Sequence, residues 1–212
     1  MHDGFTAVNP SFSKTSMIPL LACGWLTLTG FGGWQLSAYS FTPGPQGVAP
    51  VLWPAAAVNA REPGAFTVVV ALHPECPCSQ ATLEELDSIV AQSGGRLHPL
   101  VLLVELPGLP PAEDSALWQR ARRIADVRLV KDRDGAEARR FGARTSGETR
   151  LYGPDGRLLF HGGITAARGH VGDNPGQAAI AGLLLHPGTT EPPRSSPVFG
   201  CALWDDPGVP KA

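Results

Sequence analysis

The feature that most restricts the fold is a continuous apolar run followed at once by an amphipathic stretch. Residues 65–74, "AFTVVVALHP", are apolar and rich in valine, which is typical of a strand buried on both faces. Residues 79–94, "SQATLEELDSIVAQSG", place apolar side chains at helical spacing before Gly94 and Gly95 end the pattern. A buried strand followed by a helix predicts the first unit of a parallel sheet covered by helices.

The same alternation continues to residue 185. Strands are predicted over residues 96–106 and 127–132, helices over residues 112–124, 135–142 and 174–185, and a hairpin over residues 148–163 about the turn at residues 153–156. The alternating part predicts parallel strands, and the hairpin adds an antiparallel edge. Since this order is found in the thioredoxin fold, we predict an α/β protein with a thioredoxin-like three-layer α/β/α fold and a central mixed sheet.

Composition indicates a globular chain whose chemistry lies at one place. Of its 212 residues 43% are hydrophobic, and a net charge of −2 excludes attraction to nucleic acid by bulk electrostatics. Four cysteines are present: Cys23, Cys76, Cys78 and Cys201. Two of them are almost adjacent and one lies in an apolar segment, which argues against a framework of structural disulfides.

The N-terminal part has no charged side chain between Thr15 and Ala60. Within it, residues 17–41 are long and apolar enough to cross a bilayer as a helix, and Lys14 makes the first flank positive. We predict a transmembrane signal anchor with the remainder of the chain outside the cytoplasm. The alternatives are a cleaved signal peptide and a buried helix of the soluble domain.

The predicted division of the chain has five parts. They are a short tail (residues 1–16), the transmembrane helix (residues 17–41), a Pro/Gly-rich linker (residues 42–64), the thioredoxin-like domain (residues 65–187) and a C-terminal tail carrying Cys201 (residues 188–212).

Cys76 and Cys78 bracket the predicted start of the first helix of the domain. A helix N-terminus carries unpaired N–H groups and a partial positive charge, which stabilise a thiolate and lower its pKa. A protonated His73 would act in the same direction, whereas Glu75 would oppose it. The position therefore predicts reactive thiolates.

Two features depart from the thioredoxin pattern. Only Pro77 separates the two cysteines, where thioredoxins have two residues, so a disulfide between them would be strained and easily reduced. Thioredoxins also place a cis-proline opposite the cysteines, and the corresponding position here, about Ser146 or Gly147, has none. Because that proline keeps metals away from the cysteines in the family, its absence leaves ligation open.

Two other interpretations of the cysteine pair stay open. Soft thiolates select Cu(I) or Zn(II), so the same sulfurs could bind copper or zinc. The candidate ligands for that site are Cys76 and Cys78 with His73, and His161, His170 or Cys201 as further candidates. The third interpretation is that both cysteines are small buried hydrophobic residues.

The C-terminal part offers three candidate residues. The polar loop at residues 162–176 contains Arg168 and His170, which could face a substrate thiolate or anion at the rim of an active site. Alternatively, its last residues cap the following helix, with Pro175 at the first helical position. Cys201 lies in a small apolar segment, either as a buried free thiol or as a third participant that folds back onto the cysteine pair.

Four motifs together resemble the membrane-anchored, thioredoxin-like RedB proteins of bacteria: "HPECPCSQATLEEL", "LYGPDGRLLFHGGIT", "RGHVGDNPG" and "PVFGC". The similarity extends from about Phe66 to Cys201. It implies a thioredoxin-type fold and redox chemistry, with Cys76 and Cys78 as the matching positions and Cys201 in the terminal motif. It implies no particular substrate.

The sequence thus predicts a single-pass protein of the bacterial cell membrane whose soluble domain faces the periplasm or cell exterior. Its predicted reaction is thiol–disulfide exchange with a protein partner and without a cofactor, in which Cys76 attacks and Cys78 resolves a mixed disulfide. The alternatives are a copper- or zinc-delivery protein and a non-catalytic thioredoxin-like scaffold.

Overall fold

The computed structural model describes residues 14–108, 110–186 and 192–204, which fall into two units divided after Tyr39. Among the described residues, the first unit is helix α1 (Lys14–Phe41) as far as Tyr39, and the last residues of this helix belong to the second unit. Within α1, Met17–Phe41 is long and apolar enough to cross a membrane, and its most apolar window is not buried at all. These properties agree with a membrane anchor or a signal sequence.

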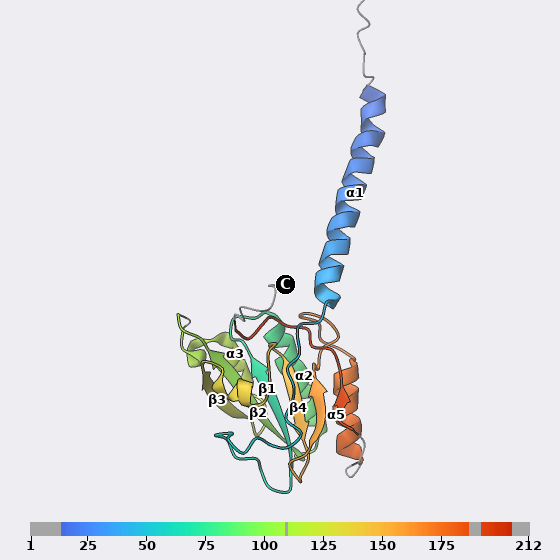
Figure 1. Ribbon diagram of the computed structural model, residues 1–212. Coiled ribbons are helices and arrows are strands. Elements are labelled where there is room, and N and C mark those ends of the chain that lie inside the picture. The colour runs from blue at the N-terminus through green and yellow to red at the C-terminus, as the bar shows by residue number, and fades with distance from the viewer. Residues whose placement is uncertain (1–13, 109, 187–191, 205–212) are drawn as a thin grey trace, which may run out of the picture. The chain divides into compact units, whose positions relative to one another are not determined.

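The second unit is built on a mixed six-stranded sheet with the order β3-β2-β1-β4-β5-β6 (Figure 1). The strands are β1 (Phe66–Leu72), β2 (Leu97–Glu105), β3 (Arg128–Arg133), β4 (Glu148–Tyr152), β5 (Leu158–Gly162) and β6 (Arg194–Ser195). Strands β1, β2 and β3 are parallel, whereas β4 runs antiparallel to both β1 and β5. The short β6 was not predicted and pairs in parallel with β5.

Helices cover both faces of the sheet. They are α2 (Cys78–Gln92), the short 3₁₀ helix η1 (Ala112–Asp114), α3 (Ala116–Ala121), α4 (Ala136–Arg140) and α5 (Pro175–Leu185). All seven residues of β1 are buried. Alternate β1 side chains enter two cores: Val68 and Val70 pack with α2, α3 and α5, whereas Val69 and Ala71 pack with α4. The predicted order of elements and the three-layer thioredoxin-like fold are confirmed.

Residues 42–64, predicted as a linker, pack against the domain instead of leading freely into it. Trp53 donates its backbone N–H to the Gly156 carbonyl (2.9 Å), and its ring lies 4.9 Å from Phe141 and 5.2 Å from Tyr152, centroid to centroid. A Cβ atom on Gly47 would lie 1.8 Å from the carbonyl oxygen of Gly142. The reason is that α4 is only five residues long, so the apolar face on its side needs a further cover.

The loop before α5 has the predicted capping arrangement. Asn174 accepts a hydrogen bond from the Gln177 N–H through its side-chain oxygen (2.8 Å), and Pro175 occupies the first turn of the helix.

Because Trp53 packs on Phe141 and Tyr152, replacing it should destabilise the domain. We expect Trp53→Ala to lower the free energy of unfolding by about 2 kcal/mol, less than for a fully buried aromatic residue because Trp53 is half-buried. Denaturant titration of the full-length protein, followed by circular dichroism, measures this change. Val48→Ala is the matched control, since Val48 lies in the same segment and is 91% exposed. Equal stabilities of the two variants would mean that the segment does not contribute to the domain.

Candidate thiol–disulfide site

The two cysteines lie where β1 gives way to α2, as the sequence predicts. A tight turn joins the two elements: Cys76 donates its N–H to the His73 carbonyl (3.2 Å), and Ser79 donates its N–H to the Cys76 carbonyl (3.0 Å). Pro77 is the exposed N-cap residue of α2, while the cysteines on either side are buried, with 4% of Cys76 and 7% of Cys78 exposed. The turn therefore directs both thiols inward and the proline outward.

Ser146 supports this turn from the loop before β4. Its hydroxyl accepts the His73 N–H (2.9 Å) and lies 2.8 Å from the hydroxyl of Ser79, which in turn donates to the His73 carbonyl (2.9 Å). No proline lies at Ser146 or Gly147, the predicted position of the thioredoxin cis-proline, and none of the described peptide bonds is cis. Gly147, with a φ of +92°, follows it, and a Cβ there would lie 2.9 Å from the Thr82 hydroxyl.

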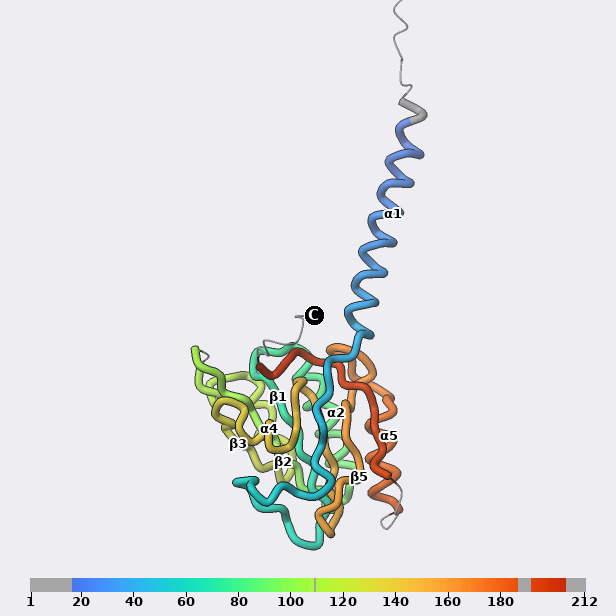
Figure 2. The backbone as a smooth tube through the Cα atoms, viewed as in Figure 1, coloured from blue at the N-terminus to red at the C-terminus, as the bar shows by residue number. Residues whose placement is uncertain are grey.

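The C-terminal segment brings a third cysteine to the site. Residues 201–203 run antiparallel to residues 144–146, with the Ser146 N–H donating to the Cys201 carbonyl (2.8 Å) and the Leu203 N–H donating to the Arg144 carbonyl (2.8 Å). This pairing sets the Cys201 sulfur 3.1 Å from the Cys76 sulfur. Figure 2 shows this segment in red at the end of the described chain.

Arg168, predicted at the rim of the site, is buried instead and contacts the C-terminal segment. Its Nη1 donates a hydrogen bond to the Gly200 carbonyl, one residue before Cys201. His170 is exposed, and its Nδ1 lies 2.7 Å from the Arg168 carbonyl. Arg168 therefore holds the segment that carries the third cysteine, a role that its sequence context does not reveal.

His73 takes part in the turn mainly through its backbone. Its ring nitrogen Nδ1 accepts the Glu75 N–H (3.2 Å), so the imidazole contacts the backbone of the turn.

The three thiols differ in electrostatic environment. Hydrogen bonds from Cys201 and Cys78 hold the pKa of the Cys76 thiol far below its ordinary value of 9.0, outweighing burial, which raises it. Hydrogen bonding with Cys201 and Cys76, together with burial, raises the pKa of Cys78. The pKa of Cys201 is also raised, chiefly by its bond to Cys76. Of the three thiols, Cys76 is therefore the one whose pKa is lowered.

A buried ion pair fixes the loop beneath the thiols. Glu148 and Arg150, 2% and 1% exposed in their side chains, lie 3.1 Å apart. The Glu148 carboxylate also accepts the N–H groups of Thr145 (3.0 Å) and Gly47 (3.0 Å), while Arg150 donates to the Gly142 carbonyl (2.7 Å). This pair was not predictable from the sequence, because two alternating polar residues in a strand are typical of a solvent-exposed face unless the segment that covers them is known.

Metal ligation has less geometric support than thiol–disulfide exchange. Within residues 14–108, 110–186 and 192–204, no three or more His, Cys, Asp or Glu side chains form a group that could hold a metal ion. The proposed ligand set of Cys76, Cys78 and His73 is therefore not assembled in this arrangement.

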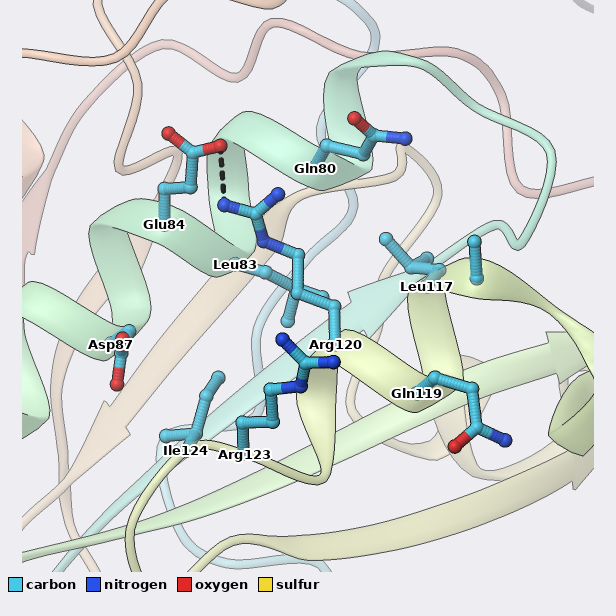
Figure 3. Close-up of a pocket in the computed structure, with 10 residues that line it drawn as sticks. Gln80, Leu83, Glu84, Asp87, Leu117, Gln119, Arg120, Arg123 and Ile124 are labelled. Carbon is cyan, nitrogen blue, oxygen red and sulfur yellow. Dashed lines mark hydrogen bonds and ion pairs between the residues drawn. The ribbon is translucent and has the colours of Figure 1, made fainter.

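A cavity of about 750 Å³ lies elsewhere, between α2 and α3 (Figure 3). Leu83 and Ile124 form part of its apolar wall, and Arg120 pairs with Glu84 across it at 2.6 Å. No cysteine lines it, so it is separate from the thiol site.

Comparison with known proteins supports the fold. No protein-family model matches the chain, and no curated protein is significantly similar to it in sequence. Among solved structures, a hypothetical protein of Sinorhizobium meliloti 1021 is 22% identical and covers 78% of this chain and 96% of its own, with a TM-score of 0.51. An uncharacterized conserved protein of Geobacillus kaustophilus is 17% identical and covers 80% and 95%, with a TM-score of 0.54.

A more distant match is a secreted Mycobacterium tuberculosis disulfide oxidoreductase homologous to E. coli DsbE. It is 15% identical and covers 58% of this chain and 82% of its own, with a TM-score of 0.41. At such identities structural similarity shows the fold alone, and with the sheet order it shows that this chain has the thioredoxin-like fold.

The hydrogen bonds to Cys76 predict an unusual titration. In a Cys23→Ser background, thiolate absorbance that depends on Cys76 should persist below neutral pH, because a lowered pKa leaves the thiol ionised there. Cys201→Ala should move this transition to higher pH, because it removes the hydrogen bond that lowers the pKa of Cys76 most. The measurement is a pH titration in the ultraviolet, with Cys76→Ser as the blank. A wild-type transition near 9.0, the ordinary thiol value, would contradict the assignment.

Proposed function

We propose that this protein is a membrane-anchored thiol–disulfide oxidoreductase that uses Cys76 and Cys78. The observation that carries the proposal is the meeting of three cysteines at the start of α2, where the Cys76 sulfur lies 3.1 Å from that of Cys201. Hydrogen bonding with Cys201 and Cys78 lowers the pKa of Cys76 in this arrangement. The thiolate is the species that attacks disulfides, so a thiol with a lowered pKa is reactive at neutral pH. A buried cysteine with a purely structural role does not require a lowered pKa.

The reaction is an exchange with a protein disulfide. The Cys76 thiolate attacks one partner sulfur, the partner's S–S bond breaks, and the other partner sulfur leaves as a thiolate that takes up a proton. The Cys76 charge disappears in the resulting mixed disulfide, so the interaction that holds Cys78 protonated disappears with it. Cys78 then loses its proton and attacks the Cys76 sulfur, which releases the second partner sulfur. Two electrons pass from the cysteine pair to the partner, and the reverse sequence oxidises a partner dithiol.

The proposed location is the bacterial cell membrane, with the domain in the periplasm or at the cell exterior. Helix α1 supplies the membrane-spanning length, and Lys14 lies at the flank expected on the cytoplasmic side. Stable disulfides belong to such oxidising compartments. The motifs shared with the RedB proteins support the same location and chemistry.

The test uses the full-length protein in detergent, equilibrated with glutathione buffers of graded potential. We expect a reversible two-electron couple in the wild type and in Cys23→Ser, and its complete loss in Cys76→Ser. Cys23 is the matched control because it lies on α1, outside the proposed site.

Metal analysis of the same preparation tests the competing function. Stoichiometric copper or zinc that is lost on Cys78→Ser would replace the oxidoreductase with a metal-handling protein. Absence of both a couple and a metal would favour the scaffold.

A further inference from the structure

The C-terminal segment is held in the thiol site by buried side chains and hydrogen bonds. Val198 and Leu203, on either side of Cys201, are both fully buried. The Ser196 hydroxyl donates to the Gly163 carbonyl (2.6 Å), which fixes the start of this segment beside β5. Cys201 is therefore held between anchored residues, so its approach to Cys76 follows from the packing of the whole segment.

The backbone around Cys201 is fitted closely to the facing loop. A Cβ atom on Gly200 would lie 1.9 Å from the carbonyl oxygen of Ser146, so only glycine allows this approach. Arg168 donates a hydrogen bond to the Gly200 carbonyl, and the Ser146 N–H donates one to the carbonyl of Cys201. These contacts specify the position of the Cys201 sulfur.

Cys76 thus has two candidate disulfide partners, which differ in the strain of the bridge and in the length of the loop that it closes. Cys78 is two residues away, and a bridge over so short a loop strains the chain. Cys201 is 125 residues away, already lies 3.1 Å from the Cys76 sulfur, and would need to approach by only about 1 Å to reach S–S bonding distance. Closing a long loop also restricts the unfolded chain far more than closing a short one does.

We propose that Cys201 is a third redox cysteine, which takes over the disulfide from Cys78 so that the resting oxidised protein carries a Cys76–Cys201 bond. This inference rests on the proposed function. Cys201 loses its proton and attacks the Cys76 sulfur, the Cys76–Cys78 bond breaks, and Cys78 leaves as a thiolate that takes up the proton. The numbers of disulfides and electrons do not change, so no further oxidant is needed.

The transfer moves the disulfide toward solvent. Cys201 is partly exposed, whereas Cys76 and Cys78 are buried. A partner thiolate that attacks the Cys201 sulfur expels Cys76 as a thiolate, and Cys78 remains beside it as a hydrogen-bond partner that lowers its pKa.

Tryptic mapping distinguishes the two disulfides in the full-length Cys23→Ser protein. Cys76 and Cys78 share the peptide of residues 62–96, whereas Cys201 lies in the peptide of residues 195–211. After oxidation with glutathione disulfide and alkylation of free thiols, we expect the two peptides to be joined and Cys78 to be alkylated. A disulfide confined to residues 62–96 would overturn the inference and leave the proposed function intact.

Single substitutions separate the two proposals further. We expect Cys78→Ser to keep a reversible two-electron couple through Cys76 and Cys201, and Cys201→Ser to keep one, at a more oxidising potential, through Cys76 and Cys78. Loss of the couple in Cys78→Ser alone would contradict the role of Cys201. Absence of any disulfide at Cys76 in the protein with all three cysteines would contradict the proposed function itself.

Gly200→Ala tests whether the position of the C-terminal segment affects formation of the Cys76–Cys201 disulfide. Its Cβ would displace the segment from Ser146, so the joined peptides should form about tenfold more slowly or worse, while the Cys76–Cys78 couple persists. Ala202→Ser is the matched control, because Ala202 is exposed in the same segment. An unchanged rate in Gly200→Ala would contradict the positioning argument.

Discussion

The buried carboxylate of Glu148 is the interaction on which the thiol site depends. A carboxylate removed from water needs compensating charge and hydrogen bonds, and Glu148 finds them in Arg150 and in the backbone N–H groups of Gly47 and Thr145. The hydrogen bonds to this carboxylate connect the loop before β4 to the N-terminal segment of the domain (residues 42–64). They also fix the backbone conformation of the loop. The loop then presents a hydroxyl and an N–H group from Ser146 at the place where β1 ends.

Three stretches far apart in the sequence meet on that loop. The turn after β1 donates a hydrogen bond to the Ser146 hydroxyl, and the C-terminal segment accepts one from the Ser146 N–H. Residues 42–64 donate a hydrogen bond to the Glu148 carboxylate. The result is a cluster of three cysteines in which hydrogen bonding with Cys201 and Cys78 lowers the pKa of Cys76.

Much of the fold was predictable because it is encoded locally. The Val-rich run of β1, the apolar spacing of α2 and the turn between β4 and β5 each follow from neighbouring residues, and their order confirmed the thioredoxin-like topology. The cap of α5 by Asn174 was predictable for the same reason. The packing of residues 42–64, the short β6 and the burial of Arg168 were not, because each depends on a partner about thirty or more residues away.

The sequence by itself determined that two cysteines stand at the junction of a buried strand and a helix, behind an apolar helix long enough to cross a membrane. Periodicity and composition suffice for such statements, because they concern residues adjacent along the chain. Only the tertiary structure decided that Cys201 lies 3.1 Å from Cys76 and that this contact lowers the pKa of Cys76. Contact between sulfurs 125 residues apart, and the pairing of the C-terminal segment with residues 144–146, are properties of distance in space, and no local pattern encodes them.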